Sequence, residues 1–369
     1  MEGRTLVRPS IAQARNEWRN QRSLLPLLGL ASLWIAGMFV PGMRGILLFP
    51  LLFLSGCETL HFYGQGVLGQ VEILRKSRPN AKIIAAPETT EALKKKLVLA
   101  EALCDFASEE LALPGDSAYH KYADIGRRHV VFVLHAATEF SLEPKTWHYP
   151  IIGELDYRGY FKEEDAIAYS RKLEAEGYEI HLGGTNAFST LGVFHDPLLN
   201  TFIDYPEIDL AETIFHELTH RRIFKSGDTT FNESLANVVQ EEGVRKYLRA
   251  KGRMAELADY KERLMRRRDF YLEIAVTREQ LTKLYASDAK EGAMRAEKKR
   301  VLGKLKARAR ALQNRWGTKA LEGWLSLELT NAHLLALITY NSEMPKFRKI
   351  MEESGGDFEV FFERVKSAE

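Results

Sequence analysis

Hydrophobic positions recur every three or four residues through several long stretches of the chain, and this spacing predicts helices. In one clear case Leu93, Leu97, Ala100 and Leu103 share a helical face, and a Pro-Gly pair at 114–115 ends the pattern. The same reasoning predicts helices over residues 88–111, 163–176, 209–224 and 232–250. From about residue 254 to 345 nearly every residue favours helix, and we expect interruptions at Gly292, Gly303, Gly317 and Gly323.

Three shorter stretches are rich in β-branched and aromatic residues, which is typical of strands. They cover residues 129–136, 147–155 and 178–182. The sequence therefore predicts an α+β fold, with a small mixed sheet between residues 129 and 205 packed on a helical half.

Composition adds few constraints, because 369 residues with 45% hydrophobic content describe an ordinary globular chain. Two cysteines are too few for a disulfide framework or a Cys-only zinc module. The net charge of +2 is too small to indicate nucleic acid. Residues 251–310, however, hold 18 Lys/Arg and 9 Asp/Glu, a net of +9, which leaves −7 for the other residues.

The first 57 residues have the pattern of a targeting segment. Three arginines, at positions 15, 19 and 22, precede an apolar run over 24–40, and a second apolar run over 45–54 leads to Ser55-Gly56-Cys57. This end resembles a bacterial lipobox, and we expect Cys57 to be lipidated. The alternative is a transmembrane anchor at 24–40. Either reading places residues 58–369 across the inner membrane, facing the periplasm.

The strongest chemical signal is His216-Glu217-Leu218-Thr219-His220. Two histidines four residues apart on a helix share a face and can bind one metal ion. Glu217, one position along, can take a proton from water and deliver it to a leaving amine. Because the apolar stripe of this helix lies roughly 200° away from the histidines, we expect them to face an open cleft. The alternative is a pair of core or capping histidines.

A third ligand is predicted at Glu233, near the start of the following helix. A turn containing Gly227-Asp228 would fold that helix back against the first one, which resembles the gluzincin metallopeptidases with their glutamate ligand. The sequence therefore predicts one zinc ion per chain, bound by His216, His220 and Glu233. Asn237, one turn later, is the expected hydrogen-bond partner of a ligating histidine. Glu233 could instead be an ordinary acid in the first turn of a helix.

Upstream, residues 183–192 form a second suggestive stretch. Asn186 and Ala187 lie in a segment that resembles the edge strand of thermolysin-like enzymes, which binds substrate as an added strand. The glycines of this stretch could equally mark a bulge or a turn.

Longer motifs support a specific resemblance. Residues 153–161, 189–192 with 196–199, the histidine motif and 231–233 together resemble the bacterial lipoprotein family described as predicted aminopeptidases. The resemblance spans about residues 54–345. It implies zinc-dependent removal of N-terminal residues from peptides. From the order of the predicted elements we expect a zincin-like catalytic region over 58–250 and a helical region over 251–369 that completes the cleft.

Peptide hydrolysis needs further groups. A hydroxyl or imidazole should stabilise the tetrahedral intermediate, and we assign this role to Tyr340, with Tyr157 and His195 as competitors. An aminopeptidase should also hold a carboxylate for the substrate ammonium group, for which Glu154 and Asp156 are candidates. An endopeptidase, another amide hydrolase, or a non-catalytic envelope lipoprotein with structural zinc are the competing functions.

The basic region over 251–310 predicts a long helical hairpin. Its charges could form a solvated face, or they could contact anionic lipid headgroups next to the membrane anchor. Nucleic acid is not expected as a partner, because aromatic stacking residues are sparse in this region.

Overall fold

The structure is a computed structural model that describes residues 57–149, 153–191, 194–338 and 343–367. The predicted signal or anchor segment and Tyr340 lie outside these residues. The described part forms two compact units, residues 261–330 in one and residues 57–260 with 331–367 in the other. None of the described helices is both apolar enough and long enough to cross a membrane.

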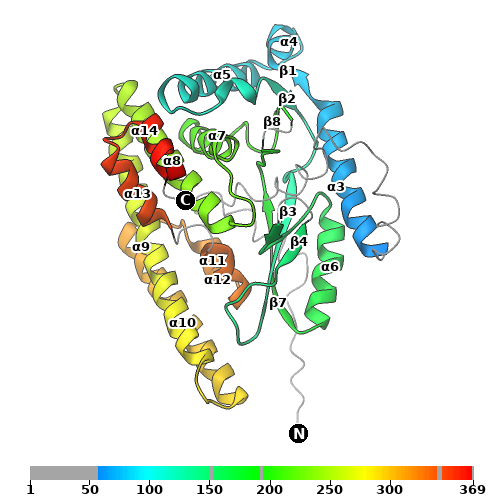
Figure 1. The fold of residues 1–369 in the computed structure, drawn as a ribbon, viewed down its shortest axis with the longest axis vertical. Coiled ribbons are helices and arrows are strands. Elements are labelled where there is room, and N and C mark those ends of the chain that lie inside the picture. Colours follow the sequence, from blue (N-terminus) through cyan, green and yellow to red (C-terminus); the bar gives the residue numbers. More distant parts are fainter. Residues whose placement is uncertain (1–56, 150–152, 192–193, 339–342, 368–369) are drawn as a thin grey trace. The chain divides into compact units, whose positions relative to one another are not determined.

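Helices dominate the larger unit (Figure 1). In chain order they are α3 (Cys57–Lys76), α4 (Asn80–Ala85), α5 (Glu91–Glu110), a 3-10 turn η3 (Gly115–Ser117), α6 (Glu163–Ala175), α7 (Glu207–Arg222), α8 (Thr229–Ala250), α12 (Asn331–Ile338), α13 (Met344–Glu353) and α14 (Phe358–Ser367). Side-chain capping explains where two of these begin. Thr90 accepts a hydrogen bond from the Leu93 amide at the start of α5, and Asp228 accepts one from the Phe231 amide at the start of α8.

The strands of this unit form three small sheets. β3 (Val131–Thr138) lies between β6 (Arg158–Tyr160) and β7 (Tyr178–Thr185), and both pairings are antiparallel. β4 (Trp147–Tyr149) and β5 (Gly153–Leu155) form a hairpin. The third sheet joins β1 (Arg78–Pro79), β2 (Lys121–Ala123) and β8 (Leu198–Leu199), with a parallel β2–β8 pair.

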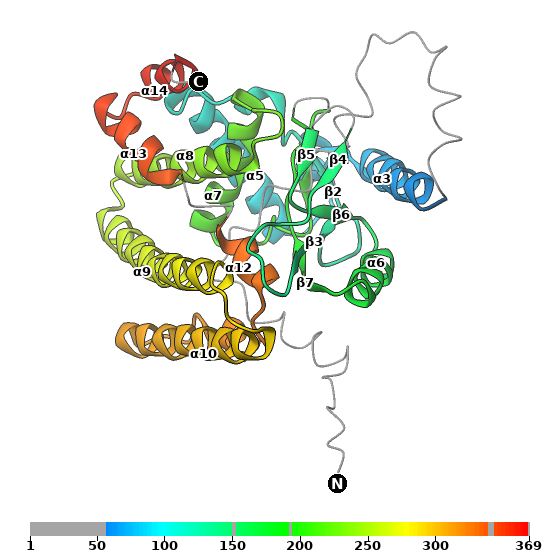
Figure 2. The ribbon, with the colours of Figure 1, turned by 60° about the horizontal axis from the view of Figure 1, so that its bottom comes forward.

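Two helices cover the β6–β3–β7 sheet. Figures 1 and 2 show α6 on one side of it and α12 on the other, and both helices contact β3 and β7. The first residue of α12 is fixed to the sheet, because the buried side-chain amide of Asn331 donates to the carbonyl groups of Thr138, Glu139 and Ser141. Helix α12 is therefore part of the larger unit, although 70 residues of helical hairpin precede it in the chain.

Helices α7 and α8 pack together at the centre of the larger unit. Phe215 of α7 contacts Phe106 of α5, and Phe231 of α8 contacts Phe347 of α13 in an edge-to-face arrangement. Gly243 permits the close approach, since a Cβ atom there would lie 2.9 Å from atoms of Leu111 and Phe215. Both central helices are thus enclosed by other elements.

The smaller unit is a helical hairpin. It contains most of α9 (Met254–Tyr285), all of α10 (Glu291–Trp316) and the short α11 (Glu322–Ser326). Arg308 of α10 pairs with Glu273 of α9, and Phe270 packs edge-to-face on Trp324. Gly317 ends α10 in the left-handed conformation, with φ 64°.

The α+β class is confirmed, but the prediction of one mixed sheet is wrong, since the strands divide into three sheets. Of the four expected interruptions, only Gly317 ends a helix, whereas Gly292 and Gly303 lie inside α10 and Gly323 inside α11. Single glycines cost a helix only about 1 kcal/mol each, which packing readily offsets. The 20-residue helix α3 was not predicted, because its three glycines obscure the helical spacing.

Candidate metal centre

Helix α7 carries the two histidines and is buried around its whole circumference. Every residue from Leu210 to His220 is buried, with His216 0% and His220 3% exposed. The expectation that the imidazoles face an open cleft is therefore wrong for the described structure. An apolar stripe indicates which face packs first, but it does not show what covers the opposite face.

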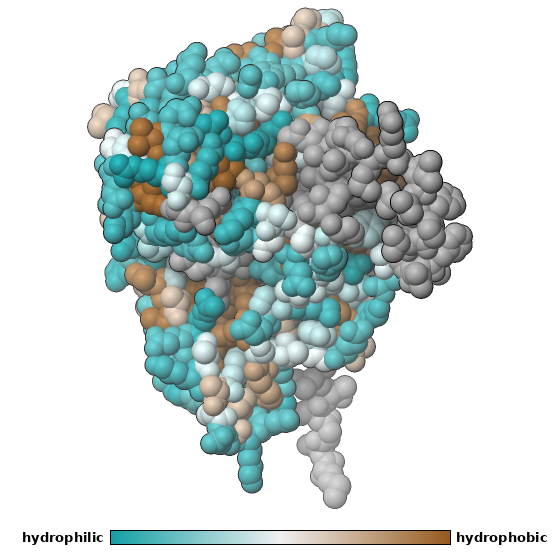
Figure 3. Space-filling model, in the orientation of Figure 1, coloured by the Kyte–Doolittle hydropathy of each residue, from teal (hydrophilic) through white to brown (hydrophobic). Residues whose placement is uncertain are grey.

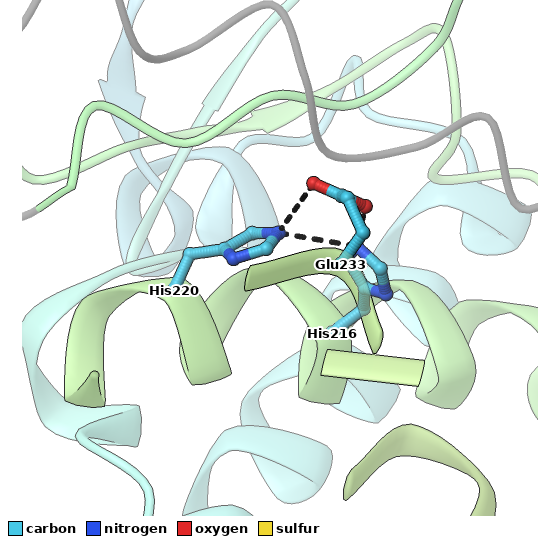
Figure 4. A group of neighbouring side chains, drawn as sticks. All are labelled: His216, His220 and Glu233. Carbon is cyan, nitrogen blue, oxygen red and sulfur yellow. Dashed lines mark hydrogen bonds and ion pairs between the residues drawn. The ribbon is translucent and has the colours of Figure 1, made fainter. Parts of the chain in front are cut away.

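The turn between α7 and α8 places Glu233. The Asn232 side chain accepts a hydrogen bond from the Lys225 amide and donates one to the Lys225 carbonyl, each 2.8 Å long. This double contact, together with the Asp228 cap, fixes the first turn of α8 to the turn that follows α7. The next residue, Glu233, then points its carboxylate at the histidines (Figure 4).

The three side chains converge on one point (Figure 4). Glu233 Oε2 lies 3.2 Å from His216 Nε2, and Glu233 Oε1 lies 3.4 Å from His220 Nε2. The two Nε2 atoms are 3.2 Å apart. One ligand atom from each residue falls within 4.8 Å of the others, so His216, His220 and Glu233 could hold a metal ion. Two imidazole nitrogens and a carboxylate oxygen form a donor set that suits zinc among other divalent metals.

Protonation favours ligation. Burial alone would raise the pKa of Glu233, but the neighbouring His220 and His216 outweigh burial and lower it to about 2. Burial lowers the pKa of His220, against the opposing effect of Glu233. An ionised carboxylate beside a neutral imidazole is the state in which both groups can bind a cation.

Gln240 accepts the hydrogen bond that orients the His216 ring. His216 Nδ1 lies 2.8 Å from Gln240 Oε1, which fixes the ring so that Nε2 faces Glu233. The sequence predicted Asn237 for this role, one turn after Glu233. Gln240 is two turns after Glu233 on the same face of α8, and only the crossing of α7 and α8 shows which turn lies beside His216.

Glu217 is 0% exposed, and neither of its carboxylate oxygens has a hydrogen-bond partner among the described residues. Burial raises its pKa well above the usual value, and the charges of Glu233 and Asp196 raise it further. A carboxyl group held in this way favours its protonated form, and its pKa would fall if a cation bound to the neighbouring triad.

Sequence reasoning missed Tyr119. It is 1% exposed, and within the described residues its hydroxyl has no hydrogen-bond partner. Burial raises its pKa, and the Glu217 charge is the next largest cause. Tyr119 adopts the left-handed conformation, with φ 66°, in the loop after η3. No motif marks this position, so only the fold could place it near Glu217.

Arg221, directly after His220, joins two loops to α7. Its guanidinium donates to the Ser117 and Phe194 carbonyls and to the buried carboxylate of Asp196, each at 2.9 Å. Thr190 donates to the same carboxylate through both its amide and its hydroxyl. The loop over 114–119 and residues 189–191 and 194–196 are thereby anchored at the end of the histidine helix. His195 is exposed, with Nδ1 2.7 Å from the Ser117 carbonyl oxygen.

Asn186 and Ala187 follow β7, which lies at an edge of its sheet. Their carbonyl groups accept hydrogen bonds from Thr201 and Thr185, respectively, and Ala187 is fully buried. The Asn186 side chain contacts His129 and Tyr205. These backbone acceptors are occupied, so the described conformation does not offer them to an added strand.

The remaining candidates are dispersed. Glu154 is exposed on β5, which starts against the turn between α7 and α8, since Gly153 lies beside Gly227. Asp156 is half-buried in the following turn, and Tyr157 is buried against His135.

Comparison with known proteins gives one match. A family model described as "Putative aminopeptidase" matches residues 61–369, which include all the residues of the centre. No curated protein and no solved structure matches the chain.

Proposed function

Since the chain belongs to the family described as "Putative aminopeptidase", we propose that it is a zinc-dependent aminopeptidase with a zincin-like catalytic centre. One observation carries the proposal. The candidate ligand atoms of His216, His220 and Glu233 converge, and Glu217, whose carboxyl group has no hydrogen-bond partner among the described residues, is buried on the same helix turn. The family name supports peptidase activity, and this geometry supports a metal-dependent form of it.

The residues fit a catalytic zinc ion. The cluster has three protein ligands, and a catalytic zinc site keeps a further position for water or substrate. When bound, the ion would supply Lewis-acid polarisation of the peptide carbonyl and a water molecule with a pKa of about 7.

Glu217 is the proposed general base and acid. It would take a proton from the attacking water and later deliver it to the leaving amine. The hydrogen bond to Gln240 fixes the His216 ring, and the two hydrogen bonds between Asn232 and Lys225 fix the start of α8. The proposed ligands on α7 and α8 are therefore preorganised.

The donor to the tetrahedral intermediate is proposed from the sequence to be Tyr340. Tyr119 is a second candidate, because its buried hydroxyl is available and lies within the electrostatic influence of Glu217. Glu154 is proposed to receive the substrate ammonium group, and Asn186 and Ala187 to contact the substrate after their present hydrogen bonds rearrange.

We further propose that the protein acts in the bacterial cell envelope, attached through lipidated Cys57 and facing the periplasm. The lipobox-like Ser55-Gly56-Cys57 sequence supports this location. Intact-mass analysis of membrane-extracted protein tests it, and an unmodified, internal Cys57 would contradict it.

The function is tested by measuring bound metal and hydrolysis on the same samples. The wild type should hold close to one zinc ion per chain, and His216→Ala should lose it. Glu217→Gln should retain zinc but lose about 10²–10⁴-fold in kcat. Glu212→Gln is the matched control, because Glu212 is also a buried acid of α7 but accepts its hydrogen bond from Tyr260.

Paired peptides separate the alternatives. An aminopeptidase should cleave peptides with a free amino terminus and leave the N-acetylated versions intact. Equal cleavage of both would indicate an endopeptidase. Bound zinc without hydrolysis of any peptide would indicate a structural metal site.

A further inference from the structure

The smaller unit holds a strong excess of positive charge. Residues 261–330 include 18 Lys/Arg and 9 Asp/Glu, a net of +9. Several acids are already neutralised within the hairpin: Glu262 pairs with Arg266, Glu273 with Arg308, and Asp269 with Arg315. The excess charge is therefore carried by side chains on its surface.

Large apolar side chains lie exposed along α9. Met265 is 60%, Leu272 55% and Val276 46% exposed. At 100° per residue these three positions fall within an arc of about 40°, so they form one stripe on the helix. The buried residues Leu264, Phe270, Ile274 and Leu281 already supply the packing face of α9. The stripe is thus a second apolar face without a use in the fold of this unit. Figure 3 shows brown side chains among teal ones over this part of the molecule.

Basic side chains flank the stripe. Lys261 and Arg268 are exposed, lie about 40° and 60° from Met265 around the helix, and form no ion pair with any described residue. Three acids lie at similar angles, but each is already paired: Glu262 with Arg266, Asp269 with Arg315 and Glu279 with Lys283. On α10, Lys299, Lys304 and Arg310 are likewise exposed and without an ion pair in the described structure. Cations beside a solvent-exposed apolar stripe are the pattern of helices that lie on a membrane surface.

We infer that the α9–α10 hairpin binds an anionic lipid bilayer, with Met265, Leu272 and Val276 inserted between headgroups and the flanking cations on lipid phosphates. A second copy of the hairpin would bring two net charges of +9 together, which opposes self-association. Nucleic acid would need stacking partners, whereas the aromatic residues among 261–330 are buried or only partly exposed. An anionic membrane offers phosphate groups to the cations and an apolar interior to the stripe.

The test places a bimane fluorophore on the stripe of the full-length chain, at Leu272→Cys. The background is Cys57→Ser, and Cys104 does not compete because it is buried and burial raises the pKa of its thiol. The chain is mixed with vesicles that contain nitroxide-labelled lipid, either of phosphatidylcholine alone or with one third phosphatidylglycerol. We expect quenching in the anionic vesicles only. Bimane at Val98→Cys, an exposed position on α5, should be quenched in neither.

Charge variants sharpen the test. Each basic residue near an anionic surface strengthens membrane binding about 5-fold. The double variant Lys261→Gln with Arg268→Gln should therefore bind the anionic vesicles about 25-fold more weakly. The control, Lys82→Gln with Lys95→Gln, removes the same charge from exposed positions on α4 and α5 and should leave quenching unchanged.

Three results would overturn the inference: no quenching at position 272 in anionic vesicles, equal quenching in both vesicle types, or equal loss in the two charge variants. A change in bimane emission with a single-stranded oligonucleotide in the absence of anionic lipid would also overturn it, in favour of nucleic acid.

Discussion

Replacement of Gln240 by leucine tests the proposed metal centre through a residue that touches neither metal nor substrate. Leucine has nearly the same size, but it removes the oxygen that lies 2.8 Å from His216 Nδ1. The ring then loses the contact that selects its tautomer and aims Nε2 at Glu233. Loss of such a partner typically lowers metal affinity 10–100-fold, which corresponds to about 1.4–2.8 kcal/mol.

The matched control is Gln65→Leu on α3. Gln65 is also buried, and its Oε1 accepts a 2.8 Å hydrogen bond, in this case from the Phe161 amide. Both substitutions leave a buried donor unpaired and should lower the free energy of unfolding by about 1–3 kcal/mol. Only Gln240→Leu should weaken zinc binding.

The assay is competition between the protein and a chromophoric zinc chelator at pH 7. Gln240→Glu provides a further comparison, because a charged acceptor increases the basicity of the imidazole and should restore binding. Zinc affinity of Gln240→Leu within 2-fold of the wild type would refute the assigned role. An equal loss in Gln65→Leu would show that the effect is general destabilisation.

Three further predictions concern stability. Arg221→Met removes the cation paired with the buried Asp196 carboxylate and should lower the free energy of unfolding by about 3–5 kcal/mol in urea titration. An effect below 1 kcal/mol would contradict the anchoring of the two loops. In metal-free protein the pKa of Glu233 is lowered to about 2, so its ionised carboxylate stabilises the fold above its unfolded pKa of about 4.5, and this stabilisation is lost as pH falls toward 2. Glu233→Gln should therefore flatten the curve of unfolding free energy against pH between these values. Parallel curves for the variant and the wild type would refute this prediction. The pKa of Glu217 is instead raised by burial, so ionisation of this group favours the unfolded state at neutral pH. Glu217→Gln should therefore raise the melting temperature of metal-free protein at pH 7.5. A lower melting temperature would contradict the burial of Glu217 without a partner among the described residues.

Local spacing in the sequence was enough to predict most helices and the ligand set of the candidate centre. The predicted helix over 163–176 is observed as Glu163–Ala175, and the one over 232–250 as Thr229–Ala250. His216 and His220 converge because both lie on one turn of one helix, which is a local property. Glu233 joins them because a short turn leaves little freedom in how α8 returns.

Features that depend on long-range packing were not predictable in this way. Gln240 lies beside His216 because of the angle at which α8 crosses α7, and Tyr119 comes near Glu217 from almost 100 positions earlier in the chain. The burial of α7 on every side depends on the elements around it, which its own stripe of Leu210, Ile214 and Leu218 does not encode. Strand spacing likewise predicted β3 and β7 but not the division into separate sheets.

The depth of the centre also sets its kinetics. His216, Glu217 and Glu233 are all 0% exposed, so an ion held by the proposed centre would leave only when the surrounding protein opens. Removal by a strong chelator should therefore follow a rate that stops rising with chelator concentration, because the opening step becomes limiting. Loading of the proposed ion would be subject to the same restriction and would be easiest while the chain is still folding, and a peptide substrate would need the same opening to reach the centre.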